Sequence, residues 1–314
     1  MPTMTEKSVH QFHAEAHVLS GSLRSPIEQR IEPHARVALK DTKGGHLLRG
    51  IEDVSIEGLV RFRSGNTRVS GGESQKAKTA PLEHGFVTLS TSVIEGLNVF
   101  EILTADRIVS QVSTDHPLEN GHVPHVNFLG TKFDNLQICG FPVEVTLNLE
   151  LCSKRPANDQ PYVTDRDFLK GIAKQVGKVA DCDVLPQKMK DLYHERLTEI
   201  NNLHDSNEGR KVTCSLVKHI KVLDEGQIPG LHIVENVIFI PHFGAVSLGE
   251  VEVGLEAKTE SNDFRRPSEI AYNGQSHGEM SNYFEVTMLN MELGCVGDAS
   301  LKAARTKTNG TTNP

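Results

Sequence analysis

The segment VEVTLNLEL, residues 143–151, alternates apolar and polar side chains without interruption. Successive side chains of a β-strand point to opposite faces of the sheet, whereas the faces of an α-helix repeat about every 3.6 residues. The segment therefore predicts a strand whose valines and leucines are buried and whose glutamates face water. A strand of this kind has to pack its apolar face against a second layer, which limits the chain to folds with stacked or closed sheets.

The same period of two recurs in GEVEVGLEA at 249–257 and, more weakly, in RIVSQVST at 107–114 and IEGLVRFR at 56–63. Glycine and proline residues separate these runs, as they do at tight turns. Many short strands joined by turns are typical of sandwiches and barrels. We therefore predict a mainly β fold, an antiparallel sandwich or barrel.

One region, at about 164–204, has the period of a helix instead. Apolar residues follow each other at spacings of three and four in TDRDFLKGIAKQVGKVA and in PQKMKDLYHERLTEINNL, which predicts two amphipathic helices. Thr164 and Asp167 resemble a capping box, and Pro186 suits the first turn of the second helix. The predicted fold is thus mainly β with a two-helix insertion.

These patterns divide the chain of 314 residues into four parts. The segments 71–83 and 258–282 are polar and rich in turn formers, and the tail SLKAARTKTNGTTNP has few large apolar side chains to bury. We predict a β-rich portion at 1–155, a helical insertion at 156–208, a second β-rich portion at 209–297 that packs with the first, and a flexible tail at 298–314.

Charge and hydropathy argue against several partners. The formal net charge is −8 and the 33 Lys and Arg residues are scattered, so nucleic acid is not an expected partner. The longest apolar run, Val237–Ile240, is far shorter than the roughly 20 residues of a membrane helix. The N-terminal residues lack the apolar core of a signal peptide, and the five cysteines contain no CxxC pair. We expect a soluble, cytoplasmic protein without membrane insertion.

Three histidines, His10, His13 and His17, lie with Glu15 in the segment SVHQFHAEAHVLSG at residues 8–21. A helix would bring the histidines to one side, with His13 and His17 at the spacing that presents two imidazoles to a zinc ion. A strand would separate the same two side chains by roughly 13 Å, too far to share a metal ion. The surrounding β pattern favours the strand, and both alternatives stay open at this point.

On a strand, a metal site would need ligands from elsewhere in the chain. The chain has 15 histidines, among which His242, His122 and His125 are candidates by type alone. We expect no cofactor. If a divalent metal such as zinc binds, the candidate ligands are His13, His17 and His242.

The sequence identifies no catalytic residue. The GxSxG, HExxH and Walker motifs are absent, as is a GxGxxG after a strand. Carboxylate pairs such as Glu144 with Glu150, or Glu250 with Glu252, are of the type used in glycoside hydrolysis. Their alternation with apolar residues indicates the water-facing side of a sheet instead.

The segment 231–256 predicts a hairpin. IVENVIFI is dense in β-branched residues, residues 241–244 form a four-residue turn, and AVSLGEVEV returns. The first half is apolar on both faces. We therefore expect this hairpin in the core or at an interface with another copy of the chain.

A resemblance appears where VIEGLNVFEILTADRIVSQVST is followed by FLGTKFDNLQICGFPVEV. The order LTAD at 103–106, a strand with Ser110 and an F-x-x-L-x-I-x-G segment at 133–140 resembles a repeated pattern of the choice-of-anchor class of bacterial surface proteins, over about residues 85–147. The chain is also similar to uncharacterised bacterial β-rich proteins with counterparts of IPHFGAVSLGE and TMLNMELGC. The resemblance implies an antiparallel β module and supplies no catalytic residues.

Two classes of function follow. We predict a non-catalytic β-rich protein with a structural, assembly or binding role, because catalytic signatures are absent and the apolar hairpin suits self-association into a homo-oligomer. The alternative is an enzyme or small-ligand carrier with a pocket inside a β-barrel, in which histidines hold a metal and the helical insertion forms a lid.

Overall fold

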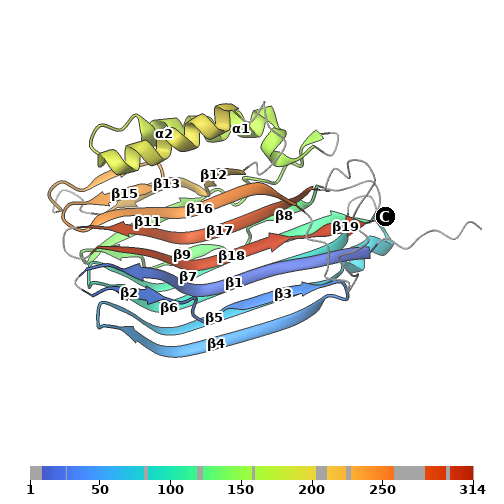
Figure 1. Cartoon of the computed structure of the whole chain (residues 1–314), viewed down its shortest axis with the longest axis horizontal. Helices are drawn as coiled ribbons and strands as arrows, with labels where there is room; N and C mark the ends of the chain where they lie inside the picture. Colours follow the sequence, from blue (N-terminus) through green and yellow to red (C-terminus); the bar gives the residue numbers. More distant parts are fainter. Residues whose placement is uncertain are drawn as a thin grey trace, which may run out of the picture.

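The computed structural model shows two antiparallel β-sheets stacked on each other, with two helices above one edge of the stack (Figure 1). This arrangement confirms the predicted mainly β fold with a two-helix insertion, and of the two predicted architectures it is the sandwich. The structure describes residues 9–25, 27–80, 84–118, 123–157, 160–202, 211–223, 228–257, 280–294 and 298–313.

Ten described strands form sheet 1, and they come from both ends of the chain. The path of the sheet is β14-β15-β16-β17-β18-β1-β19, while β12 pairs with β16, and β2 and β3 pair with β1. The strands are β1 (Val9–Leu23), β2 (Gln29–Ile31), β3 (Val37–Asp41), β12 (Lys211–Ser215), β14 (His232–Val234), β15 (Val237–Ile240), β16 (Gly244–Ala257), β17 (Met280–Leu293), β18 (Ala299–Asn309) and β19 (Thr311–Asn313).

Nine described strands form sheet 2. Its path is β13-β11-β10-β7-β6-β5-β4, and β8 and β9 also pair with β7. The strands are β4 (Gly45–Ile56), β5 (Val60–Glu73), β6 (Gly85–Val99), β7 (Leu103–Pro117), β8 (His125–Asn127), β9 (Lys132–Asp134), β10 (Gln137–Ile138), β11 (Phe141–Leu147) and β13 (Val217–Val222), with short 3-10 helices η1 (Gln75–Lys78) and η3 (Tyr162–Thr164) in the connections.

Side chains from both sheets fill the space between them. Inward-facing residues such as Ile108 of β7 are fully buried in one continuous hydrophobic core. The sheets approach so closely at Gly65 that a Cβ there would lie 2.7 Å from Cγ1 of Val18. Hydroxyl groups also join the sheets, since Ser92 of β6 donates to the backbone carbonyl of His17 at 2.8 Å. Among the described residues, the interior of the sandwich is therefore a packed core.

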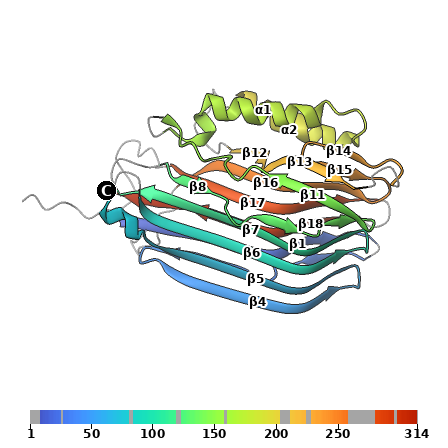
Figure 2. The ribbon, with the colours of Figure 1, turned by 180° about the vertical axis from the view of Figure 1, so that it is seen from behind.

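The helices α1 (Arg166–Ala180) and α2 (Gln187–Asn202) lie side by side above β12 and β15, as both ribbon views show (Figures 1 and 2). The first helix is capped by Asp165, whose side chain accepts hydrogen bonds from two backbone N–H groups of the first turn. The predicted cap at Thr164 is wrong by one residue, because Thr164 instead bonds back to the carbonyl of Pro161. Within the described residues, neither helix is long and apolar enough to cross a membrane.

The predicted flexible tail at 298–314 is wrong. β18 lies inside sheet 1, hydrogen-bonded to β17 on one edge and to β1 on the other. Apart from Leu301, its inward-facing side chains are small, and Ala303, Thr306 and Thr308 are fully buried. A central strand has its backbone groups satisfied by two neighbours, so it needs little apolar area of its own to be held in place.

The two predicted β-rich portions do pack together, but they do not form separate sheets. β1, from the 1–155 portion, lies in sheet 1 beside β18, and β13, from the 209–297 portion, pairs with β11 in sheet 2. The hydrophobic core extends through both portions and reaches the helices. The chain is thus one interleaved unit over the described residues.

Two further local predictions change. The strand predicted at 143–151 ends at Leu147, and the next residue donates its N–H to the carbonyl of Leu216. The loop predicted at 71–83 begins later than expected, because β5 continues to Glu73 and η1 follows it. Most of the loop predicted at 258–282 lies outside the described residues.

Candidate ligand-binding groove

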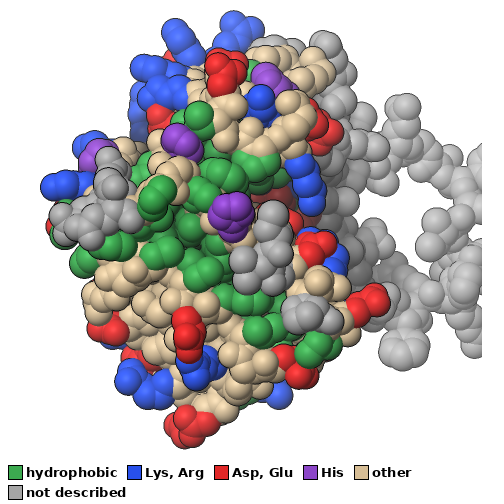
Figure 3. Space-filling model, turned by 90° about the vertical axis from the view of Figure 1, so that its left-hand side faces the viewer, with side chains coloured by type: hydrophobic (Ala, Val, Ile, Leu, Met, Phe, Trp, Pro, Cys, Tyr) green, Lys and Arg blue, Asp and Glu red, His purple; other side chains and the backbone are tan. Residues whose placement is uncertain are grey.

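A groove of about 1010 Å³ runs between the first half of α2 and the outer face of sheet 1, which is the face turned away from sheet 2. Its other walls are the β15–β16 turn, the end of β17 and residues that flank β1 and β18. Figure 3 shows the end of the molecule at which β17 ends and β18 begins; hydrophobic side chains gather in the middle of this surface, with charged side chains around them.

The sequence of α2 explains why the helix covers the sheet without closing the groove. Met189 and Tyr193 are 7% and 2% exposed, whereas Leu192 between them is 37% exposed. Residues four apart share one face of a helix, so α2 contacts the sheet along a narrow stripe. Leu192 lies beside this stripe and lines the groove.

A buried ion pair forms the floor of the groove. Nη1 of Arg196, from α2, lies 2.8 Å from Oε1 of Glu250 in β16, and the two side chains are 15% and 8% exposed. Asn290 of β17 donates from Nδ2 to the other carboxylate oxygen of Glu250 at 2.6 Å. The sequence placed Glu250 on the water-facing side of its strand. The strand face is correct, but Glu250 is buried because the helical layer covers this part of the sheet.

The charge of Glu250 also affects the ionisation of its neighbours. Burial lowers the pKa of Arg196, but attraction to Glu250 and the hydrogen bond between them outweigh burial, and the net pKa is raised. Burial and then the charge of Glu250 raise the pKa of Tyr193 to about 12 and that of Cys214 to about 12. All three groups therefore keep their ordinary protonation states near neutral pH, and none is poised as a nucleophile or a general base.

At the open end of the groove, Arg24 bridges two acidic side chains. Its Nη2 lies 2.8 Å from Oδ1 of Asp298 and 3.7 Å from Oε2 of Glu292. The hydroxyl of Ser300 donates to the other oxygen of Glu292 at 2.6 Å. By contrast, Oδ1 of Asn290 is buried without a hydrogen-bond partner among the described residues. The floor of the groove therefore contains an unused acceptor, which lies just beneath its solvent-accessible surface.

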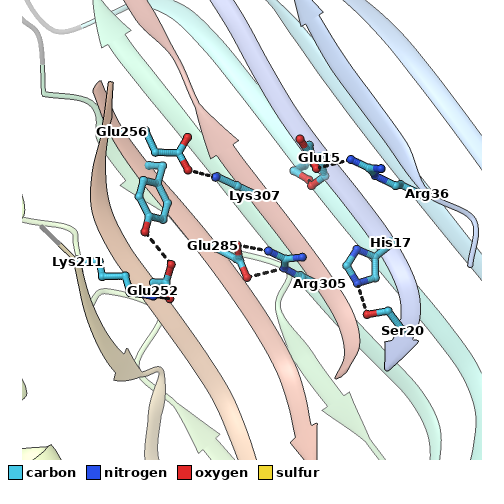
Figure 4. A network of polar contacts seen from close by, with 12 residues as sticks. Glu15, His17, Ser20, Arg36, Lys211, Glu252, Glu256, Glu285, Arg305 and Lys307 are labelled. Carbon is cyan, nitrogen blue, oxygen red and sulfur yellow. Dashed lines mark hydrogen bonds and ion pairs between the residues drawn. The ribbon is translucent and has the colours of Figure 1, made fainter. Parts of the chain in front are cut away.

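Beyond the groove, the outer face of sheet 1 carries a network of ion pairs (Figure 4). Arg305 of β18 donates two hydrogen bonds of 2.5 Å to Glu285 of β17. Three further pairs lie on either side of it: Lys307 with Glu256, Lys211 with Glu252 at 3.2 Å, and Arg36 with Glu15 at 3.3 Å. We call these eight residues the charge ladder.

Residues 9–23 form strand β1, which confirms the favoured alternative for the histidine segment. His13 lies 3.0 Å from Glu15, and its hydrogen bond is the largest cause that lowers the pKa of Glu15 to about 2. His17 is hydrogen-bonded to Oγ of Ser20 at 2.9 Å. Burial, followed by the positive charge of Arg305, lowers the pKa of His17 to about 4. These imidazoles belong to the polar network of the sheet face.

The three candidate metal ligands do not form one group. His13 and His17 take the separate partners described above, whereas His242 lies in the β15–β16 turn and lines the groove. Throughout the part of the chain that the structure describes, no group of three or more His, Cys, Asp or Glu side chains is placed to hold a metal ion. His122 lies outside the described residues, and His125 is in β8.

Sequence reasoning missed Arg196 and Asn290. In the sequence, Arg196 follows Glu195 and resembles any charged residue on a solvated helix face. A signal was nevertheless present, because Met189, Tyr193 and Arg196 are four and three residues apart and share one face of the helix. A charge on the buried stripe of a helix requires an opposite charge beneath it.

The position of the groove also differs from the expectation of a pocket inside a β-barrel. The groove lies on the outer side of one sheet, under a helix, and the space between the sheets is filled by the core. A ligand bound there would contact both the insertion and the sheet.

Residues 10–254 match the model of the family described as domain of unknown function DUF8256, and since the match covers most of the chain, the chain belongs to this family. Neither the curated proteins nor the solved structures contain a match. The matched residues include α2 and most of β16, while β17 and β18 lie beyond them. The segment that matches the family model thus includes one wall of the groove and part of its floor.

Proposed function

We propose that this protein is a non-catalytic binding protein that holds a small ligand with an apolar body in the groove beneath α2. Small-molecule sites are concave, measure roughly 300–1,000 Å³ and combine apolar walls with a few placed polar groups. The groove has a volume of about 1010 Å³, at the upper end of this range. Its apolar walls include Met189, Leu192, Phe239 and Leu293.

The proposal rests on one observation: the groove beneath α2 has open volume next to apolar side chains. The interior of the sandwich is packed, and the charge ladder saturates the outer face with ion pairs. Under α2, the outer face of sheet 1 combines apolar walls with a buried polar floor, formed by Arg196, Glu250 and Asn290. This combination favours binding through burial of apolar surface, with orientation provided by the floor.

Titration with Nile red, an uncharged dye that fluoresces in apolar surroundings, tests the proposal. We expect saturable binding of one dye per chain. Leu192→Asp, which places a charge on the apolar wall, should weaken the affinity about tenfold, as expected for losing roughly 1.4 kcal/mol of apolar contact. Leu129→Asp is the matched control, because Leu129 is 61% exposed between β8 and β9 and does not line the groove.

Equal affinities of the two variants, or dye binding that does not saturate, would contradict the proposal. Thermal unfolding of both variants has to be measured in parallel. Because both leucines are exposed, we expect each variant to change the free energy of unfolding by less than about 0.5 kcal/mol.

We further propose that the chain associates with itself through β4. Among the described strands, β4 lies at one end of sheet 2 and pairs only with β5, and Leu47 and Leu48 are 41% and 68% exposed. An open strand edge with exposed apolar side chains is a template for pairing with a second copy. Light scattering should show an oligomer that Leu48→Lys dissociates; a monomeric wild type would reject this role for β4.

We assign the protein to the cytoplasm. The support is that Cys139, Cys152, Cys182 and Cys214 are all free thiols, as in a reducing compartment. Fractionation of cells that produce the full chain, with immunodetection, tests this assignment. Recovery of the protein outside the cytoplasmic fraction would contradict it.

A further inference from the structure

We propose that the groove selects a small amphiphile whose polar end is a protonated primary amine. The inference rests on the proposed function of the groove and adds the chemical class of the ligand. It follows from three properties of the described lining. Acidic side chains outnumber basic ones, the floor contains hydrogen-bond acceptors, and both arginines are already paired with carboxylates.

The lining of the groove is acidic. Five acidic side chains and three basic ones line it, an excess of two negative charges. Asp191 and Glu195 lie on the exposed side of α2, and Glu292 lies opposite them on β17. Low-dielectric walls strengthen the field inside a groove, so the excess attracts a cation and disfavours a carboxylate or a phosphate.

The floor offers hydrogen-bond acceptors. Each oxygen of Glu250 already accepts one hydrogen bond, from Arg196 and from Asn290 respectively. A carboxylate oxygen has room for a second, and Oδ1 of Asn290 has no partner among the described residues. An ammonium group carries three donors and no acceptor, which matches this set.

Both arginines of the lining are engaged by acids and are therefore poor anchors for an anion. Arg196 is paired with Glu250, and Arg24 with Asp298 and Glu292. The third basic side chain of the lining, Lys188, is exposed on α2. At the two arginines an anionic ligand would have to displace these carboxylates, whereas a cation can bind without breaking either pair. The groove also has the volume of a small molecule, and its apolar walls suit an alkyl chain.

Isothermal titration of the full chain at pH 7 with three probes of equal chain length tests the inference. The probes are dodecylammonium and dodecanoate, each below the concentration at which it forms micelles, and dodecanol below its solubility limit. We expect one dodecylammonium per chain, bound at least tenfold more tightly than dodecanol, with dodecanoate the weakest. Equal or tighter binding of dodecanol or dodecanoate would overturn the inference while leaving the groove as a binding site.

Two variants locate the ammonium. Asn290→Leu keeps the approximate shape but removes both the free acceptor and the hydrogen bond to Glu250. Glu292→Gln removes one charge from a partly exposed position. We expect each to weaken dodecylammonium about tenfold and to change dodecanol less than threefold. The matched control is Glu52→Gln, an exposed acid on β4.

The outcomes separate the two proposals. Loss of selectivity for the amine in Glu292→Gln supports the inference even if Asn290→Leu is too unstable to measure. Equal effects of the groove variants and of Glu52→Gln would overturn it, because the preference would then come from the overall charge of the protein. Failure of all three probes and of Nile red to bind would overturn the proposed function itself.

Discussion

The outer face of sheet 1 has two halves that use charge differently. The charge ladder runs across β12, β16, β17, β18, β1 and the residue before β3. In it, each charged group faces an opposite charge from another segment, and the pairs are open to solvent on one side (Figure 4). In the groove, α2 covers the sheet and one pair, Arg196 with Glu250, is removed from water. In both halves, the charged side chains of the strands come from the positions that alternate with the buried apolar residues.

The difference shows what the helical insertion adds to the sandwich. Without a cover, polar residues on a sheet face neutralise one another and leave no site for a ligand. Under α2, one ion pair is buried in the floor, and the helix contacts the sheet along a narrow stripe that leaves Leu192 beside the groove. We therefore attribute the proposed binding to the insertion and the stability of the sheet face to the ladder.

We expect the largest loss of stability when the buried pair of Arg196 and Glu250 is broken. Arg196→Met leaves Glu250 buried without its cation and should lower the free energy of unfolding by about 4 kcal/mol, as breaking one side of a buried ion pair does. The double variant Arg196→Met with Glu250→Leu should recover most of this loss, because no unpaired charge is left. Urea unfolding measures both, and a loss below about 1 kcal/mol in the single variant would show that the pair is solvated.

We expect the second-largest loss of stability on lowering the pH, because His17 is buried in its neutral form. Its pKa is lowered from 6.5 to about 4 by burial and by the positive charges of Arg305, Arg36 and Lys302, against the opposing effect of Glu15. Between these pH values the unfolded chain binds a proton that the folded chain does not. The neutral His17 therefore contributes full stability above pH 6.5, and about 3 kcal/mol is lost as the pH falls to 4.

His17→Gln should remove this part of the pH dependence. Ser20→Ala is the matched control, since it removes the hydrogen bond to His17 but keeps the titrating group. We expect the control to be less stable at every pH, with the slope between pH 6.5 and 4 unchanged. Unfolding curves at several pH values measure the slope, and identical slopes for wild type and His17→Gln would contradict the buried, neutral state of His17.

A smaller effect is expected within the ladder. Arg305→Met removes two hydrogen bonds to Glu285, whose side chain is 12% exposed, and should cost about 2 kcal/mol. Arg305→Lys keeps the charge but loses the two-pronged geometry, and should cost about half as much. Thermal unfolding of both variants tests this order. A larger loss for Arg305→Met than for Arg196→Met would reverse the comparison between the two halves.

The smallest effect is expected at the exposed end of the ladder. Lys211 is 51% exposed and lies 3.2 Å from Glu252. Surface ion pairs contribute little, so Lys211→Met should change the free energy of unfolding by less than about 0.5 kcal/mol. A loss above about 1.5 kcal/mol in denaturant unfolding would indicate that the ladder acts as one cooperative network.

The sequence predicted most elements because their patterns are local. The period of two at 249–257 and the helical spacing around Ile172 depend only on which face each residue occupies. The prediction of a flexible tail at 298–314 failed, because Ala303 and Thr306 are small and their strand is held by the neighbouring strands β17 and β1. Nothing within that segment indicates that a gap between β17 and β1 exists for it to fill.

The site was less predictable than the fold. His242 was named for metal chemistry and does line the groove, but the residues that form the floor come from different elements. Arg196 and Glu250 are 54 residues apart, and Asn290 is 40 residues further on. Which charge of a helix meets which charge of a strand depends on how α2 is placed over the sheet, and sequence periodicity contains no information about that placement.

A crystal structure of the full chain with dodecylammonium tests the central claim most directly. We predict that the ammonium nitrogen lies within about 3.2 Å of Oδ1 of Asn290 or of a carboxylate oxygen of Glu250, with the alkyl chain against Leu192 under α2. Dodecylammonium bound instead along the charge ladder, with the groove beneath α2 empty, would contradict the account.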